Sequence, residues 1–195
     1  MGLAKLKSKL SVAEYIEGEN LSEIRHEYIY GEVYAMAGAS DKHNIINGNI
    51  FGNIWNHLRN SRCQAFSENM KLRADEQTFY YPDVMVDCDD VPPSSFYREK
   101  PVLLVEVLSP STERIDRNEK LSVYKTIPTL QEYLIVSQEK ISVEVHRKLE
   151  NGEWQAEFYD EFDTEIRLDS IDFNLSLSEI YRRVDLTPQA DEFPQ

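Results

Sequence analysis

The chain has 195 residues, of which 41% are hydrophobic and 29% charged, proportions that are typical of a globular protein. This length suits one domain with a core of its own, and the longest apolar run, residues 102–108, is too short to span a membrane. The formal net charge of −14 argues against broad electrostatic coating of nucleic acid, although most of the acidic excess lies in residues 151–195.

The first part of the chain predicts a short helix, a hairpin and a long helix. Ser11-Val-Ala-Glu14 has the form of a capping box and begins a helix that we expect to end at Gly18. Residues 25–37 are rich in tyrosine and β-branched residues, which predicts a β-hairpin. Apolar residues recur every four positions in residues 43–60 and predict an amphipathic helix with one buried face.

The remainder of the chain predicts several strands of a sheet, together with two helices. Strand-like runs occupy residues 63–73, 79–88, 102–109 and 132–137, and residues 141–159 form a hairpin around Asn151-Gly152. Asp116-Arg-Asn-Glu119 is a second capping box that begins a helix ending before Pro128, and Ser176 caps a last helix. This order predicts an α/β protein with a mixed sheet flanked by helices and an added C-terminal hairpin.

We expect a single domain over residues 11–184, with flexible termini at residues 1–10 and 185–195. No apolar stretch follows the lysines near the start, so we expect no secretory signal. Cys63 and Cys88 are too few for a disulfide framework and indicate buried thiols. These features together predict a cytoplasmic protein.

Glu106 interrupts the apolar run VLLVEVL, which has the composition of a strand covered on both faces. A carboxylate in that place loses its hydration, and a partner must compensate for the loss. The partner is either a lysine or arginine in a buried ion pair or a metal ion at a catalytic site. The residues alone leave both interpretations open.

Asp83 follows Pro82 at the start of another predicted strand, where a turn residue is the simplest interpretation. If this strand neighbours residues 102–109, however, Asp83 and Glu106 converge. Two close carboxylates need a cation, and oxygen-rich sites of this kind suit Mg²⁺ or Mn²⁺.

Lys120 is expected in the first turn of the helix that Asp116 caps. A solvated surface charge is the usual fate of a lysine. The functional interpretation is an ammonium directed back at the two carboxylates, where it neutralises a phosphate or orients a water. Tyr124, one turn later, is expected to pack rather than react.

Four segments in this order, YPDVMV, VEVLSPST, DRNEKLSVY and EYLIV, resemble the bacterial restriction endonuclease-like family of the PD-(D/E)XK nuclease superfamily. The resemblance extends to YIYGEVYAMAGASDKHN upstream and IDFNLSLSEIY downstream, and it implies a restriction-endonuclease-like fold. Asp83 matches the aspartate of the PD motif and Glu106 the acid of the (D/E)XK motif, which implies that both bind the metal. Leu108 stands where the motif has its lysine, and Lys120 is the matching position on the next helix.

Two further positions match the family pattern. Glu32 follows the hairpin glycine, and His43 begins the helix over residues 43–60. Both are accessory candidates for the site. A charge beside a turn and a structural or helix-capping histidine are the alternative interpretations.

The resemblance implies a Mg²⁺- or Mn²⁺-dependent endonuclease that acts on DNA, with RNA left open as a substrate and no membrane association. Asp83 and Glu106 would hold the metal, and Lys120 would stabilise the charge that develops. A homodimer suits cleavage of both strands, and the two predicted hairpins offer edges for pairing. The alternative is a non-catalytic interaction or regulatory module with a nuclease fold, which the acidic charge and Leu108 favour.

Overall fold

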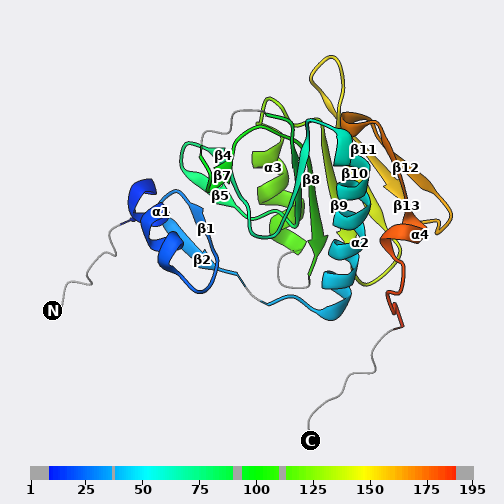
Figure 1. Cartoon of the computed structure of the whole chain (residues 1–195), viewed down its shortest axis with the longest axis horizontal. Helices are drawn as coiled ribbons and strands as arrows, with labels where there is room; N and C mark the ends of the chain where they lie inside the picture. Colours follow the sequence, from blue (N-terminus) through cyan, green and yellow to red (C-terminus); the bar gives the residue numbers. More distant parts are fainter. Residues whose placement is uncertain (1–8, 37, 90–93, 110–112, 188–195) are drawn as a thin grey trace, which may run out of the picture.

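A six-stranded mixed sheet forms the centre of the computed structural model, which describes residues 9–36, 38–89, 94–109 and 113–187 (Figure 1). The strand order is β11-β10-β9-β8-β6-β3, in which β8 and β9 are parallel and all other neighbours are antiparallel. The strands are β3 (Gln64–Ser67), β6 (Val84–Asp87), β8 (Pro101–Leu108), β9 (Glu132–Ser137), β10 (Val143–Lys148) and β11 (Trp154–Tyr159).

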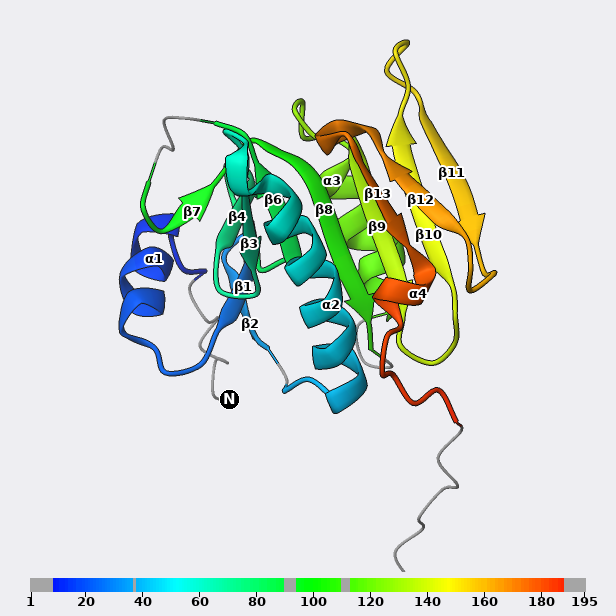
Figure 2. The ribbon, with the colours of Figure 1, turned by 45° about the vertical axis from the view of Figure 1, so that its right-hand side comes forward.

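Helices cover both faces of this sheet, which explains why β8 is apolar except at Glu106. Helix α2 (Asp41–His57) lies in front of the sheet in Figure 2, and its three buried isoleucines pack against valines of β6 and β8. The other face is covered by a π-helical turn, η2 (Ile115–Lys120), and by α3 (Leu121–Tyr124), which pack over Leu104 and Leu108. The predicted α/β architecture is therefore confirmed.

A second sheet, absent from the sequence prediction, lies beside the first with the order β2-β1-β5-β4-β7. Helix α1 (Val12–Leu21) packs on it and stacks Tyr15 on Tyr28, with 4.8 Å between ring centroids. The β1–β2 hairpin corresponds to the one predicted at residues 25–37. The strands are β1 (His26–Ile29), β2 (Glu32–Ala35), β4 (Lys71–Asp75), β5 (Thr78–Tyr80) and β7 (Tyr97–Arg98).

The two predicted strands at residues 63–73 and 79–88 were wrong in extent, because each is divided between the two sheets. The first breaks into β3 and β4 at Glu68, which has a left-handed backbone with φ of 45°. The second breaks into β5 and β6 at residues 81–83, where Pro82 has no N–H to donate to a ladder. These two breaks place Glu68 and Asp83 at the junction of the sheets.

The C-terminal part adds a layer on the α2 side of the central sheet (Figure 2). The β10–β11 hairpin forms as predicted, and Gly152 takes the positive φ, 85°, that its turn requires. A further hairpin follows that was not predicted. It consists of β12 (Glu165–Leu168), η3 (Asp169–Ile171) and β13 (Phe173–Ser176), and α4 (Leu177–Ile180), capped by Ser176 as expected, closes the layer.

Two helix boundaries differ from the prediction. Helix α1 continues past Gly18 to Leu21, because a single glycine weakens a helix without ending it. The second predicted capping box is wrong, since the chain is already helical at Glu113 and Asp116 is buried within the π-helical turn. Lys120 therefore lies about two turns into the helical segment and not in its first turn.

The prediction of two buried thiols was also wrong. Cys63 and Cys88 are half-buried and form a disulfide across the adjoining ends of β3 and β6, next to the paired residues Gln64 and Asp87. Most of the two predicted flexible termini, residues 1–8 and 188–195, lies outside the described residues. Within the described ranges, no helix has both the length and the apolar character needed to cross a membrane.

Candidate metal and catalytic site

A cavity of about 670 Å³ lies between the β1–β2 hairpin, the start of α2, the turns at the sheet junction and the ends of β6 and β8. Three predicted site residues, Asp83, Glu106 and Lys120, line this cavity together with the accessory candidate His43. Glu32 is not part of the lining: it lies exposed on β2, where its carboxylate accepts a hydrogen bond from Tyr34 at 2.6 Å. Further charged groups of the lining are Arg25, Glu27, Glu68, Arg114, Asp116 and Glu119.

Asp83 occupies the entry to β6, and β6 pairs with β8 as the sequence predicted. Val84 is opposite Val105, so the same antiparallel register carried one residue further sets Asp83 against Glu106. The Asp83 Oδ2 atom accepts a hydrogen bond from the backbone N–H of Val107 at 2.7 Å. The backbone carbonyl of Asp83 accepts one from the N–H of Glu68 at 3.1 Å. Asp83 is thus fixed by both strands and by the β3–β4 turn.

Glu106 is deeply buried at the cavity, with 4% of its surface exposed. Its Oε1 atom accepts hydrogen bonds from Lys120 Nζ at 3.1 Å and from the Tyr124 hydroxyl at 2.8 Å. Burial, together with neighbouring carboxylates, raises the pKa of Glu106 well above its ordinary value, and the Lys120 charge opposes this rise. Tyr124 packs in the core as expected, and its hydroxyl in addition holds this carboxylate.

Lys120 is not a surface charge but a buried ammonium that is 5% exposed. Its Nζ atom lies 3.0 Å from Glu27, 3.1 Å from Glu106 and 3.3 Å from Asp116. Burial opposes the charged form, but these three carboxylates outweigh it and raise the pKa of Lys120 well above its ordinary value. The π-helical turn places Asp116 one turn before Lys120, and Glu27 reaches it from β1.

His43 lies beside Asp83 at the start of α2. Ser40 caps this helix by accepting a hydrogen bond from the His43 backbone N–H at 3.1 Å, and the imidazole Nε2 lies 3.3 Å from Asp83 Oδ2. Although burial disfavours the imidazolium, the carboxylates of Asp83 and Glu68 raise the pKa of His43 above its ordinary value. The histidine is therefore part of the cavity's charge network and does not cap the helix with its side chain.

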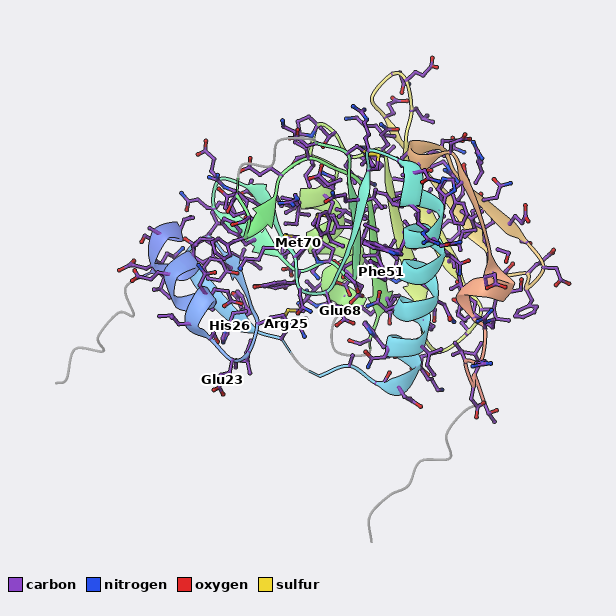
Figure 3. The ribbon with its side chains drawn as sticks, viewed as in Figure 1. Glu23, Arg25, His26, Phe51, Glu68 and Met70 are labelled. Atoms are coloured by element: carbon purple, nitrogen blue, oxygen red, sulfur yellow. A yellow bond between two sulfur atoms is a disulfide. The ribbon has the colours of Figure 1, made fainter. Side chains whose placement is uncertain are left out.

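Glu68 joins His43 and Asp83 in a cluster that sequence reasoning missed. One ligand atom from each of the three residues lies within 4.8 Å of the others. Glu68 and Glu27 gave no sequence signal, because a charged residue in a turn or on a short strand is normally solvated. Figure 3 shows Glu68 next to Arg25, whose guanidinium lies 3.8 Å from the Glu68 carboxylate.

Comparisons with known proteins place this chain in a family. The model of the Uma2 family, described as "Putative restriction endonuclease", matches residues 12–179. The chain belongs to the Uma2 family. "Uncharacterized protein slr1290" of Synechocystis sp. (strain ATCC 27184 / PCC 6803 / Kazusa) is 36% identical over 176 residues, which are 89% of this chain and 92% of the relative. "Uncharacterized protein sll1609" of the same strain is 34% identical over 149 residues, which are 74% of this chain and 84% of the relative.

A solved structure has the same fold. It is the crystal structure of "a putative nuclease belonging to DUF820" from Anabaena variabilis ATCC 29413, with a TM-score of 0.70 and 19% identity. The match covers 88% of this chain and 97% of that one. The restriction endonuclease-like family and the α/β fold expected from the sequence are thereby confirmed. The roles of the predicted site residues stay predictions; these residues are Asp83, Glu106, Lys120, Glu32 and His43.

Proposed function

We propose that this protein is a metal-dependent endonuclease that hydrolyses phosphodiester bonds in DNA. The observation that carries the proposal is the cavity lined by Asp83, Glu106 and a buried ammonium, Lys120, which pairs with Glu106. Carboxylates beside a lysine are the groups that phosphoryl chemistry with a divalent ion requires, and the nuclease family agrees with this assignment.

The donor set fits a divalent cation. Asp83 and Glu106 supply carboxylate oxygens at the adjoining ends of two paired strands, and the nearby imidazole of His43 adds a nitrogen. Oxygen-rich sites of this kind suit Mg²⁺ and Mn²⁺. We assign Asp83 and Glu106 as the residues that would hold the ion. A bound Mg²⁺ or Mn²⁺ supplies Lewis-acid polarisation of a phosphoryl oxygen and an acidified water as nucleophile.

The protein's own groups orient and neutralise the reacting phosphate. Lys120 presents a permanent positive charge to the cavity, because three carboxylates hold its proton in place. This charge would stabilise the negative charge that develops on the phosphate in the transition state. The Arg25 and Arg114 side chains at the cavity lining are exposed and would contact flanking phosphates.

A cleavage assay with variants tests the proposal. The full chain is incubated with single-stranded and double-stranded DNA and with RNA, in Mg²⁺, in Mn²⁺ and in a chelator. We expect cleavage of DNA that requires the metal, and we expect Asp83→Asn to lose it by orders of magnitude because a ligand charge is removed. Glu99→Gln is the control, because Glu99 pairs with Arg73 away from the cavity.

The proposed role of Lys120 is tested with two variants. Lys120→Met removes the counter-ion of two buried carboxylates, Glu106 and Asp116, and of the partly buried Glu27. Breaking a buried ion pair costs roughly 3–5 kcal/mol in stability, so the fold of the variant is checked first by circular dichroism. Lys120→Arg keeps the charge but displaces it. Loss of cleavage in both folded variants, with metal binding retained, supports the proposed role. Unchanged cleavage in both contradicts it.

The non-catalytic alternative is favoured by one contact, the buried ion pair of Glu106 with Lys120, which satisfies both groups without a metal. Absence of cleavage of every nucleic acid tested in both metals would make that alternative the better one.

We also propose that two copies assemble, because β2 and β11 are edge strands of the two sheets. The β2 edge exposes Val33 and Tyr34, and the β11 edge exposes Phe158. Sedimentation should show a dimer, and a monomer across a wide concentration range would reject this assembly.

A further inference from the structure

We propose that Glu68, a residue outside the PD-(D/E)XK pattern, is a metal ligand that binds the divalent cation together with Asp83 and His43. The inference rests on the proposed function only in assuming that the cavity takes a divalent ion. It adds a site that combines two carboxylates with one imidazole, contributed by the β3–β4 turn, the entry to β6 and the start of α2.

The first support is that the chain holds Glu68 at a specific place. Its backbone has a positive φ of 45°, a strained conformation that a residue with a side chain rarely adopts. The backbone N–H of Glu68 donates to the carbonyl of Asp83 at 3.1 Å, so the two residues are joined directly. Surrounding structure therefore sets the position of Glu68 relative to Asp83.

The second support is the fixation of the Glu68 side chain. The buried side chain of Asn47, one turn after His43 on α2, donates from Nδ2 to Glu68 Oε1 at 2.7 Å. Arg25 donates to the Glu68 backbone carbonyl at 3.1 Å and also lies near the carboxylate (Figure 3). Outer partners of this kind orient ligands in metal sites.

The third support is the state of His43. Its side chain is 10% exposed and lies 3.3 Å from Asp83, and its Nδ1 atom has no hydrogen-bond partner among the described residues. Buried polar atoms nearly always have a partner. A buried imidazole that keeps one nitrogen unpartnered, and that offers a ligand atom within 4.8 Å of the Asp83 and Glu68 carboxylates, is consistent with an ion bound in the cavity.

Access distinguishes this cluster from the motif acid Glu106. The Glu106 side chain is 5% exposed, and its Oε1 atom already accepts from Lys120 and Tyr124. The Glu68 side chain is 31% exposed, so an ion from solution can reach it with part of its water shell. An imidazole among the ligands favours Mn²⁺ over Mg²⁺, because Mg²⁺ prefers oxygen ligands alone.

Calorimetric titration of Mn²⁺ into the full chain, without nucleic acid, tests the inference. We expect Glu68→Gln to bind Mn²⁺ at least about tenfold more weakly, since even second-shell changes cost 10- to 100-fold. Glu99→Gln is a matched control, because the Glu68 and Glu99 side chains are both 31% exposed and both pair with an arginine. We expect its affinity to stay within about twofold of the parent's. His43→Gln should reduce the preference for Mn²⁺ over Mg²⁺.

The outcomes separate this inference from the proposed function. If Asp83→Asn loses Mn²⁺ while Glu68→Gln binds like the parent, the assignment of Glu68 is overturned and the endonuclease proposal stands. If the parent binds Mn²⁺ through Glu68 but cuts no nucleic acid, the inference stands and the endonuclease proposal fails. A parent that binds neither metal overturns both. If Glu68→Gln does not fold, Glu68→Asp, which keeps the charge and shortens the side chain, is held to the same tenfold criterion.

Discussion

The hydrogen bond from the Tyr124 hydroxyl to Glu106 can be removed by a substitution that changes little else. Tyr124 is fully buried and donates to Glu106 Oε1 at 2.8 Å. Tyr124→Phe keeps the ring and its packing but leaves the carboxylate with Lys120, at 3.1 Å, as its remaining side-chain donor among the described residues. A hydrogen bond to a charged group contributes about 1.5–3 kcal/mol, and this range is the loss we expect in the free energy of unfolding. For a chain of this size, that lowers the melting temperature by roughly 3–12 °C.

Urea denaturation of the parent and two variants measures this loss. The matched control is Tyr28→Phe, because Tyr28 is equally buried and its hydroxyl donates at 2.9 Å to a neutral backbone carbonyl, that of Leu10. The control should lose about 0.5–1.5 kcal/mol. If Tyr124→Phe loses no more than Tyr28→Phe, the hydroxyl does not stabilise a charged Glu106 and the argument fails. We also expect weaker Mn²⁺ binding in Tyr124→Phe alone, since only that hydroxyl orients a proposed ligand.

Three further predictions concern stability away from the cavity. Glu132→Ala removes a buried carboxylate that accepts from Arg147 and from two backbone N–H groups of η3, and urea denaturation should show a loss of about 3–5 kcal/mol. A loss below about 1 kcal/mol would contradict the role of this contact. Burial raises the pKa of Asp87, so ionisation of this carboxyl opposes folding once the pH exceeds the ordinary carboxyl pKa. Asp87→Asn should therefore increase the free energy of unfolding at about pH 7 and leave it unchanged at about pH 3. Cys63 and Cys88 should give no free thiol when the unreduced protein is denatured, and reduction should cost about 3.5 kcal/mol for a loop of 25 residues.

Apolar periodicity and turn residues predicted those helices and hairpins that show one such pattern over their whole length. Helix α2 was found because three of its isoleucines share one buried face, and the β10–β11 hairpin because Asn151-Gly152 is a typical turn pair. The second sheet could not be found in this way. Residues 63–73 and 79–88 keep the composition of strands across their breaks, and only the three-dimensional pairing assigns each half to a different sheet.

The candidate site shows the same division between local and long-range information. Asp83, Glu106 and Lys120 were predicted from burial arguments and from motif segments, and all three line one cavity. Glu27 and Glu68 gave no signal, because each becomes part of the cavity only through contacts with residues distant in the sequence. A single glutamate in a turn or on a short strand looks the same in the sequence whether its side chain is solvated or buried.

The breaks in the two strands connect the fold to the site. If residues 63–73 and 79–88 were unbroken strands, their alternate side chains would point to opposite faces of one sheet. Nothing would then bring the Glu68 and Asp83 carboxylates to one place. A left-handed residue at Glu68 and a proline before Asp83 interrupt the ladders at neighbouring points, and the Glu68 N–H joins the two interruptions. Both carboxylates then point into the space between the sheets instead of into a core. The backbone cost of the Glu68 conformation is therefore tied to the feature that assembles the proposed metal ligands, which is where strained residues are expected to occur.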